Sequence, residues 1–275
     1  MTVMGAAGRS HSAALDRVVL IGEGIGYSAS PAIHNAAFTA LGIPWRYELR
    51  DIVAGELPDV FDELRSGALR GANITKPHKV RAIEFTDELD VSAGRVGAVN
   101  TIVVRDGRLV GHDTDLPAIT EQVAVLTQAR RADAPRFRSA VVLGRGGAAQ
   151  AVAAVLADAG AAVELIGRDR WAELPVLLGS ADLLVNATPV GTAADESPVE
   201  RALMRPDLTV LDLVYRPSPT RLVRDARATW ATARDGAWIL LRQAALSFEL
   251  WTGEAAPVGA MRRALEAELG VVADA

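Results

Sequence analysis

The chain has 275 residues, half of them apolar, which is enough for two modest domains that each have their own core. Its formal net charge is -5, and arginines alternate with Asp and Glu, so no basic face suits a phosphate backbone and no nucleic acid partner is expected. The absence of cysteine excludes disulfides, thiolate catalysis and cysteine-ligated metal sites.

No segment resembles an export signal or a membrane span. Residues 1–16 mix Gly, Ala, Ser, Arg and His without a continuous apolar core, and we expect them to form a loose extension. The apolar stretch 237–251 contains Arg242, Gln243 and Glu249, and it is shorter than the ~20 apolar residues that a membrane span needs. We therefore expect a buried helix there, and a cytoplasmic protein without a membrane partner.

The first part of the chain alternates between strand and helix patterns. In chain order, β-branched runs and apolar periodicity predict a strand over residues 18–21, a helix over 31–40, a strand over 45–49, a helix over 56–66, a strand ending near 72–75 and a strand over 99–104. A turn follows at Asp106-Gly107. This alternation argues for a parallel sheet.

The second part begins with a helix predicted over residues 116–129. The polar, proline-containing stretch 130–139 follows and is a natural seam between domains. The later elements are strands over 140–143, 162–166, 183–186 and 209–213, an Ala-rich helix ending at 159, and helices over 239–251 and 261–269. Residues 140–166 thus form a complete βαβ unit.

The turn inside this βαβ unit is rich in glycine and reads Gly144-Arg145-Gly146-Gly147. In nucleotide-binding units one glycine permits the tight turn, a second lets the backbone approach the pyrophosphate, and the helix start supplies free N–H groups. Glycine also serves such turns for steric reasons alone, but the strand before the turn, the helix after it and the second strand beyond it favour a nucleotide site.

The second strand of the unit ends in Gly167-Arg168-Asp169-Arg170. An arginine at this place suits the 2′-phosphate of NADP, whereas an acidic residue suits the ribose of NAD. Arg168 therefore favours NADP, and Asp169 leaves NAD open. The alternative is that Arg168 and Arg170 are solvated turn residues.

A segment with the side chains for proton transfer spans residues 71–79, where a buried strand ends in polar residues. Lys79 can donate a proton to a carbonyl oxygen when a neighbouring carboxylate keeps the amine oriented and charged. Asp113 and Asp115 are the candidates for that carboxylate. Most lysines and aspartates are solvated surface charges, so each residue taken alone is ambiguous.

Two serines and three histidines are further candidates. Ser28 and Ser30 precede a predicted helix, where they serve either as helix caps or as hydroxyl donors to an anionic substrate. His34, His78 and His112 lack the spacing of a metal site, so structural or solvent-facing roles are expected for them and no metal is predicted.

Together these segments resemble the shikimate dehydrogenase family, whose motifs run SxSPxxHN, NxTxPHK, VNT, NTD, GxGG, NATPxG, DxxYxPxxT and a closing Q with FELWTG. The matching residues here are Ser28-Ala29-Ser30-Pro31 with His34-Asn35, residues 73–79, Val99-Asn100-Thr101, Thr114-Asp115, residues 144–147, Asn186-Ala187-Thr188-Pro189 with Gly191, Asp212 with Tyr215, Pro217 and Thr220, and Gln243 with residues 248–253. The matches keep the family's order over nearly the whole chain.

The resemblance implies an α/β fold with an N-terminal α/β substrate domain and a Rossmann-like nucleotide-binding domain. Residues 1–115 would form the substrate domain, with the C-terminal helices of residues 238–275 returning to it, and residues 116–237 would bind NAD(P). The active site would lie in the cleft between the two domains. A monomer or a homodimer is expected.

The resemblance also assigns roles to single residues. Lys79 and Asp115 would form the catalytic pair, and Ser28 and Ser30 would hold the carboxylate of a shikimate-like acid. The remaining substrate residues would be Thr75, Asn100, Tyr215 and Gln243, and the cofactor residues would be Gly144, Gly146, Gly147, Ala148, Arg168 and Thr188. The implied reaction is the reversible, NADP-dependent reduction of 3-dehydroshikimate to shikimate.

Several positions depart from the family pattern. Asp113 replaces the usual Asn and places a second carboxylate near the lysine, and Lys76 replaces an apolar residue. Residues 23–27 lack the usual His and Pro-Ile, and residues 171–182 are too few for the family's additional helix and strand. These departures leave open a quinate or aminoshikimate dehydrogenase that uses NAD, and a non-catalytic ligand-binding paralogue. Retention of both Lys79 and Asp115 argues against the paralogue.

Overall fold

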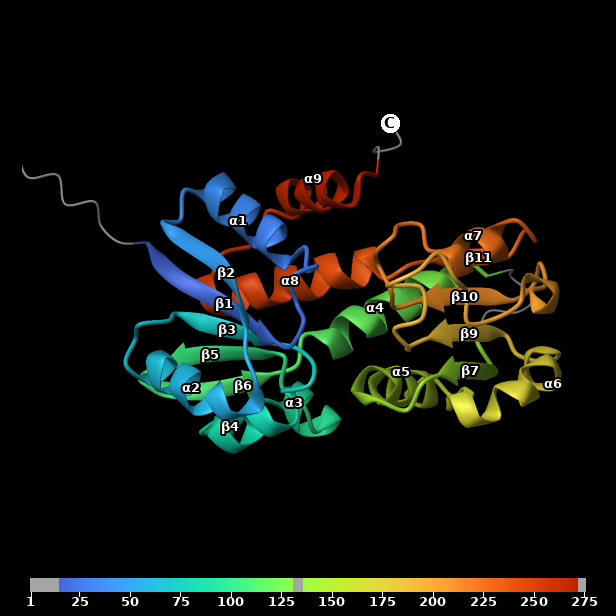
Figure 1. The fold of residues 1–275 in the computed structure, drawn as a ribbon, viewed down its shortest axis with the longest axis horizontal. Helices are drawn as coiled ribbons and strands as arrows, with labels where there is room; N and C mark the ends of the chain where they lie inside the picture. The colour runs from blue at the N-terminus through green and yellow to red at the C-terminus, as the bar shows by residue number, and fades with distance from the viewer. Residues whose placement is uncertain (1–14, 131–135, 272–275) are drawn as a thin grey trace, which may run out of the picture.

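The computed structural model describes residues 15–130 and 136–271, which form two β-sheets with helices on their faces. Figure 1 shows the two sheets in separate halves of the molecule, with α4 (Asp115–Gln128) and α8 (Ala237–Thr252) running between them. Apart from residues 15 and 16, the extension predicted at the start of the chain lies outside the described residues. None of the helices in the described ranges is long and apolar enough to cross a bilayer.

The first sheet has the strand order β2-β1-β3-β5-β6-β4 within the described residues. Its strands are β1 (Asp16–Gly22), β2 (Trp45–Asp51), β3 (Gly71–Ile74), β4 (Glu88–Leu89), β5 (Thr101–Arg105) and β6 (Arg108–His112). β1 pairs in parallel with β2 and β3, whereas β5 is antiparallel to both β3 and β6. The prediction of a parallel sheet is therefore confirmed for β1, β2 and β3 and wrong for β5, because a β5–β6 hairpin enters this sheet.

The hairpin turn accounts for this difference. Asp106 and Gly107 have φ angles of 50° and 75°, which is the left-handed backbone that a two-residue hairpin turn requires. The sequence prediction recognised the turn but not β6, the strand that follows it.

The second sheet is parallel throughout the described strands, in the order β11-β10-β9-β7-β8. Its strands are β7 (Ser139–Leu143), β8 (Ala162–Ile166), β9 (Leu183–Asn186), β10 (Thr209–Asp212) and β11 (Thr232–Arg234). Four of these were predicted, and β11 was not. This parallel sheet with helices on both faces confirms the predicted Rossmann-like half.

Both sheets are buried on two faces, which explains why their central strands read as continuous apolar runs. In β1, Val18 and Leu20 point into one core while Val19 and Ile21 point into the other. In β7 the side chains alternate in the same way between the two cores of the second sheet.

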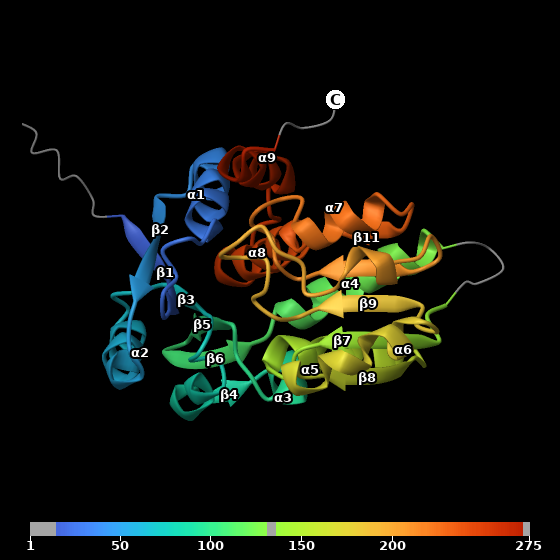
Figure 2. The same cartoon turned by 45° about the vertical axis from the view of Figure 1, so that its right-hand side comes forward.

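Helices cover all four faces. The helices not yet bounded are α1 (Ser30–Leu41), α2 (Leu57–Arg65), α3 (Val91–Val96), α5 (Gly147–Asp158), α6 (Leu174–Leu178), α7 (Arg221–Arg227) and α9 (Val258–Leu269). α1, α8 and α9 share a core on one face of the first sheet, and Figure 2 shows α9 beside α1. α4 and α5 cover one face of the second sheet, and α6 and α7 cover the other.

The long helices predicted from periodicity are confirmed, with ends that differ by one to a few residues. α4 already packs on the second sheet, so the polar stretch 130–139, predicted as a seam between domains, lies within the part of the chain that builds this half. Its residues 131–135 lie outside the described ranges.

Residues 171–182 are fewer than in the family pattern. They hold the end of a 3-10 turn and the short helix α6, whose Leu174 and Leu178 enter the core.

The return of α8 to the first sheet depends on a glycine. The indole Nε1 of Trp251 donates to the carbonyl oxygen of Ile102 at 2.9 Å. A Cβ on Gly71 would lie 2.4 Å from that Nε1 and 3.1 Å from that carbonyl oxygen, so only glycine leaves room for the indole at this hydrogen bond.

We expect Gly71→Ala to lower the free energy of unfolding by about 2 kcal/mol or more, because overpacking displaces the indole and breaks its hydrogen bond. Gly259→Ala in α9 is the matched control, since its Cβ would meet nothing closer than 3.6 Å, and it should be neutral or stabilising by up to ~1 kcal/mol. Denaturant unfolding of the two variants measures the difference. Equal stabilities would contradict the packing described for α8.

Candidate active site

A cavity of about 610 Å³ opens between the two sheets. Its walls come from the loops that follow β1, β3, β7, β9 and β10, together with the start of α4 and one side of α8. These loops all lie at the carboxyl ends of parallel strands, which is where open α/β sheets bind ligands. Both halves of the molecule therefore contribute to one site.

Lys79 and Asp115 meet at this cavity and form an ion pair through the lysine Nζ and the aspartate Oδ2. Lys79 lies in the loop after β3, and its carbonyl oxygen accepts a hydrogen bond of 2.9 Å from the backbone N–H of Val99. Asp115 is the first residue of α4, where the helix dipole favours a carboxylate. The two side chains are 30% and 27% exposed, so the pair is sheltered but open to the cavity.

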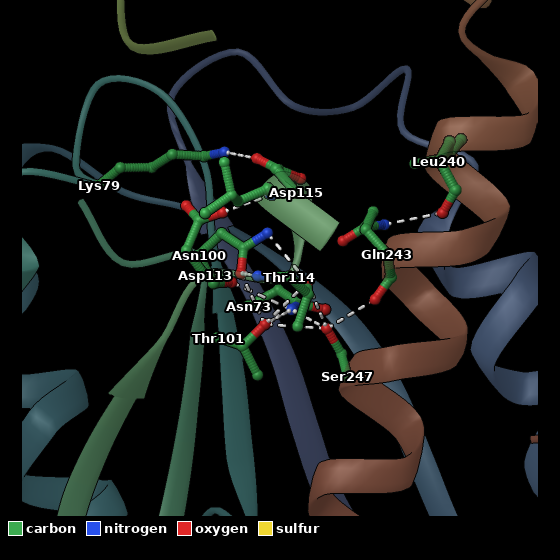
Figure 3. A network of polar contacts seen from close by, with 11 residues as sticks. Asn73, Lys79, Asn100, Thr101, Asp113, Thr114, Asp115, Leu240, Gln243 and Ser247 are labelled. Atoms are coloured by element: carbon green, nitrogen blue, oxygen red, sulfur yellow. Dashed lines mark hydrogen bonds and ion pairs between the residues drawn. The ribbon is translucent and has the colours of Figure 1, made fainter. Parts of the chain in front are cut away.

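A buried polar network fixes the two elements that carry this pair (Figure 3). Asn100 donates its amide to the Thr114 hydroxyl at 3.0 Å and accepts the Thr114 backbone N–H at 2.8 Å, which ties the residue after Val99 to the start of α4. Asn73 of β3 donates to the hydroxyls of Thr101 and Ser247 at 2.9 and 3.1 Å. Ser247 belongs to α8, so this network also anchors the returning helix.

The electrostatics keep the lysine charged. Burial alone would lower the pKa of Lys79, but the charges of Asp115 and Asp113 and the hydrogen bond to Asp115 outweigh burial and leave the pKa above its ordinary value. The amine can therefore hold a proton at neutral pH. A charged amine at the edge of a cavity is suited to proton donation.

The hydroxyl groups of Ser28, Ser30 and Tyr215 line one part of the cavity, which we call the hydroxyl wall. The Ser28 and Ser30 hydroxyls lie 3.2 Å apart, and the cap position of α1 is Ala29, which makes no side-chain cap bond. The two serines are thus not the caps of this helix. Burial raises the pKa of the Tyr215 phenol, so this group remains a neutral hydrogen-bond donor. Gln243 of α8 also lines the cavity, and its amide donates to the Leu240 carbonyl at 2.9 Å.

The glycine loop reaches the cavity only at Gly147. Gly144 has a φ of 116°, and a Cβ there would lie 3.0 Å from the Ala187 carbonyl oxygen, so this turn requires glycine. At Gly146 and Gly147 a Cβ would meet no atom within 4 Å, which leaves the start of α5 open to a ligand. Open N–H groups at the start of a twelve-residue helix fit a pyrophosphate.

Arg168 lies outside the cavity, at the end of β8. Its guanidinium lies 5.7 Å from the centre of the Trp171 ring, and among the described residues it forms no ion pair. Asp169 is 3.2 Å from Arg145 of the glycine loop. An exposed arginine without a carboxylate partner fits a 2′-phosphate, so the residues of this half fit NADP.

The structure brings together most of the residues predicted for the site. The cavity is lined by the predicted residues Lys79, Asp115, Ser28, Ser30, Thr75, Asn100, Tyr215, Gln243, Gly147, Ala148 and Thr188. Gly144, Gly146 and Arg168 do not line it. Sequence reasoning missed Asn73 and Ser247, which are buried and hold the network together. Asn73 falls within a family motif, but Ser247 carries no such signal.

The three histidines take structural positions. The His34 ring stacks on Tyr47 with centroids 4.3 Å apart, and His78 Nε2 lies 2.8 Å from the Ile52 carbonyl oxygen. His112 Nδ1 lies 3.1 Å from Asp90. In the described ranges no group of three or more His, Asp or Glu side chains could hold a metal ion.

Known proteins resemble this chain over nearly its whole length. A family model described as "Shikimate dehydrogenase substrate binding domain" matches residues 20–102, and one described as "Shikimate 5'-dehydrogenase C-terminal domain" matches residues 236–266. A Natronomonas pharaonis protein named shikimate dehydrogenase (NADP(+)) is 39% identical, with 93% of this chain and 100% of the relative covered.

Solved structures give the same result. Shikimate 5-dehydrogenase from Thermus thermophilus, in complex with NADP(H) and shikimate, is 36% identical with a TM-score of 0.81, over 93% of this chain and 100% of that chain. Quinate dehydrogenase from Corynebacterium glutamicum, in complex with NAD, also has a TM-score of 0.81, at 28% identity over 92% of this chain and 99% of that chain.

A buried carboxyl group, that of Asp212, holds the end of β10 beside the cavity and makes the stability of the fold depend on pH. Asp212 accepts hydrogen bonds from Asn186 and Thr220, and burial raises its pKa to about 6. A raised pKa means that the folded state holds this proton more tightly, so the stabilisation is full below about pH 4 and is lost as pH rises through 6. This loss lowers the free energy of unfolding by on the order of 2–3 kcal/mol as pH rises from 4 to 8, and Asp212→Asn should abolish it.

Denaturant unfolding of the wild type and Asp212→Asn across pH 4–8 measures this. Asp182→Asn is a control of opposite sign: burial raises the pKa of Asp182, but hydrogen bonds from the backbone of Arg138 and Ser139 outweigh burial and leave it lowered. Asp182 therefore contributes stability that is lost only as pH falls below about 4, so across pH 4–8 the curve of Asp182→Asn should run parallel to that of the wild type. Parallel pH curves for wild type and Asp212→Asn would contradict the assignment.

Proposed function

Because this chain belongs to the shikimate dehydrogenase family, we propose that it catalyses the reversible, NADP-dependent reduction of 3-dehydroshikimate to shikimate. The chain is an NAD(P)-dependent oxidoreductase that acts on a CH–OH group. The observation that carries the proposal is the Lys79–Asp115 pair at a cavity lined by both halves of the molecule.

Lys79 acts as the acid in reduction. Its ammonium group donates a proton to the carbonyl oxygen of the substrate, and the amine is left neutral until it takes a proton from solvent. Asp115 accepts a hydrogen bond from the amine and so orients it toward the cavity. In the oxidative direction the neutral amine removes the proton from the ring hydroxyl.

The substrate carboxylate binds at the hydroxyl wall. Ser28 and Ser30 present two hydroxyls close together, and the neutral phenol of Tyr215 borders the same part of the cavity. Hydroxyl donors satisfy a carboxylate without a fixed counter-charge. Thr75, Asn100 and Gln243 also line the cavity, and we assign the contacts with the ring hydroxyls to them.

The cofactor binds in the half that contains the parallel sheet. The turn at Gly144 and the start of α5 would hold the pyrophosphate, Ala148 and Thr188 would face the cofactor, and Arg168 would hold the 2′-phosphate. When bound, the reduced nicotinamide supplies the hydride that adds to the carbonyl carbon. We accordingly assign substrate binding to residues 1–115 with 238–275, and cofactor binding to residues 116–237.

A second candidate is a quinate dehydrogenase that uses NAD. Two observations favour it: the acidic Asp169 beside Arg168, and the equally high TM-score of a quinate dehydrogenase solved with NAD. The free guanidinium of Arg168, without a carboxylate partner among the described residues, favours NADP over this alternative.

Lys79→Ala should lower kcat by at least ~100-fold with shikimate and NADP, the scale of general acid–base catalysis, and leave the KM for shikimate nearly unchanged. Steady-state kinetics measure both constants. Lys76→Ala is the matched control, because this nearby lysine lines the same cavity but its Nζ lies 5.9 Å from the centre of the Tyr27 ring, whereas Lys79 pairs with Asp115. A near-normal rate for Lys79→Ala contradicts the proposed role.

Arg168→Ala should raise the KM for NADP by about 10-fold, because a charge-assisted hydrogen bond to the 2′-phosphate is lost, and should leave the KM for NAD unchanged. Arg170→Ala is the control, because Glu173 and Glu164 already occupy that guanidinium at 2.7 and 3.3 Å. Equal changes in the KM for NADP and the KM for NAD would show that Arg168 does not bind the 2′-phosphate.

A further inference from the structure

Asp113 places a second carboxylate at the proton-transfer site. It follows β6 directly, is only 3% exposed and lines the same cavity as Lys79 and Asp115. Figure 3 shows it close to Asn100, beneath the Lys79–Asp115 pair. The family motif has Asn at this position, so the charge is a feature of this chain.

One hydrogen bond fixes the carboxylate of Asp113, and a second fixes its backbone. Its Oδ1 accepts the backbone N–H of Leu116 at 2.8 Å, and the backbone N–H of Asp113 donates to the Ser92 hydroxyl at 2.9 Å. Among the described residues Asp113 has no ion-pair partner of its own. Its negative charge therefore acts on the groups of the cavity.

The charged groups around Asp113 come from several elements. Lys79 and Asp115 face it from the active-site cavity, and their charges act on it directly. A second cavity, which Asp113 also borders, is lined by the ionisable residues Asp90 before α3, Arg105 of β5, His112 of β6 and Glu249 of α8. The Nδ1 atom of His112 lies 3.1 Å from the carboxylate of Asp90.

The titration behaviour agrees with this geometry. Burial and the charge of Asp115 raise the pKa of Asp113 to about 6, against the opposing effect of Lys79. Asp113 is therefore ionised at neutral and alkaline pH. Two carboxylates then surround one ammonium group, and both raise the pKa of Lys79.

We propose that Asp113 is a positioning residue for proton transfer, whose carboxylate helps to keep the Lys79 amine protonated and so sets the pH range in which this amine is an acid rather than a base. The inference rests on the proposed function, because it takes Lys79 as the proton donor. With Asp113 present, carbonyl reduction continues to higher pH, and alcohol oxidation begins only at the higher pH where the amine loses its proton.

The sequence offers a direct test, because Lys76 and Lys79 are its two lysines. In protein labelled with 13C-lysine the side chains give two NMR signals, and Lys76→Arg assigns them. Asp113→Asn removes the charge but keeps an oxygen to accept from Leu116. We expect it to lower the pKa of Lys79 by about one unit, which is the lower end of the effect of a nearby opposite charge.

Asp90→Asn is the matched control: it keeps the acceptor for the Ala93 N–H and removes a carboxylate that lines the second cavity but not the active-site cavity. It should leave the Lys79 titration unchanged. If Asp113→Asn does not fold, Asp113→Ser gives the same test, because its hydroxyl can accept from Leu116 without a charge.

Kinetics supply the second readout. The alkaline limb of the kcat/KM profile for reduction and the acidic limb for oxidation both report the pKa of Lys79 in the free enzyme. In Asp113→Asn the midpoint of each limb should therefore fall by about one pH unit, which is a tenfold change in the ratio of charged to neutral amine at a given pH. A purely structural role would lower both rates without moving either limb.

The two hypotheses fail in different ways. A Lys79 signal that titrates as in the wild type in folded Asp113→Asn overturns the inference and leaves the proposed function intact. If the pKa of Lys79 falls in Asp113→Asn but the Lys79→Ala variant keeps a near-normal rate, the proposed function is overturned, and the pKa shift has no catalytic meaning.

Discussion

The contact between Lys79 and Asp115 is the constraint on which the rest of the site depends. Lys79 lies in a loop after β3, and Asp115 lies at the start of α4. Both side chains are partly exposed and could be solvated separately, so the pair forms only if the backbone of both segments is held in place. Asn100 supplies that restraint, because its amide binds both the backbone and the hydroxyl of Thr114.

The same network explains why α8 returns to the first sheet. Ser247 reaches the buried amide of Asn73 and the Thr101 hydroxyl, and Trp251 packs on the strand beside them. A buried polar group without partners is costly, so these bonds favour one placement of α8 over others. Because α8 also carries Gln243 into the cavity, the packing that stabilises the fold shapes the site as well.

Much of this arrangement could be predicted from the sequence. Continuous apolar runs predicted the central strands, and the ordered motifs singled out Lys79, Asp115 and the two serines, which the structure brings to one cavity. The hairpin strand β6 was missed because it is short and begins and ends in polar residues, and Ser247 because its partners lie 146 and 174 residues away in the chain. Such contacts are set by tertiary packing, so local patterns do not reveal them.

The most direct test of the account is the initial rate of reduced-nicotinamide formation, followed by absorbance, with shikimate or quinate paired in turn with NADP or NAD. The account predicts the fastest turnover with shikimate and NADP, because the hydroxyl wall and Arg168 suit that pair. Preferential turnover of quinate with NAD would contradict it in favour of the second candidate. Silence with all four pairs, while the acids still raise the melting temperature, would contradict an enzymatic role altogether.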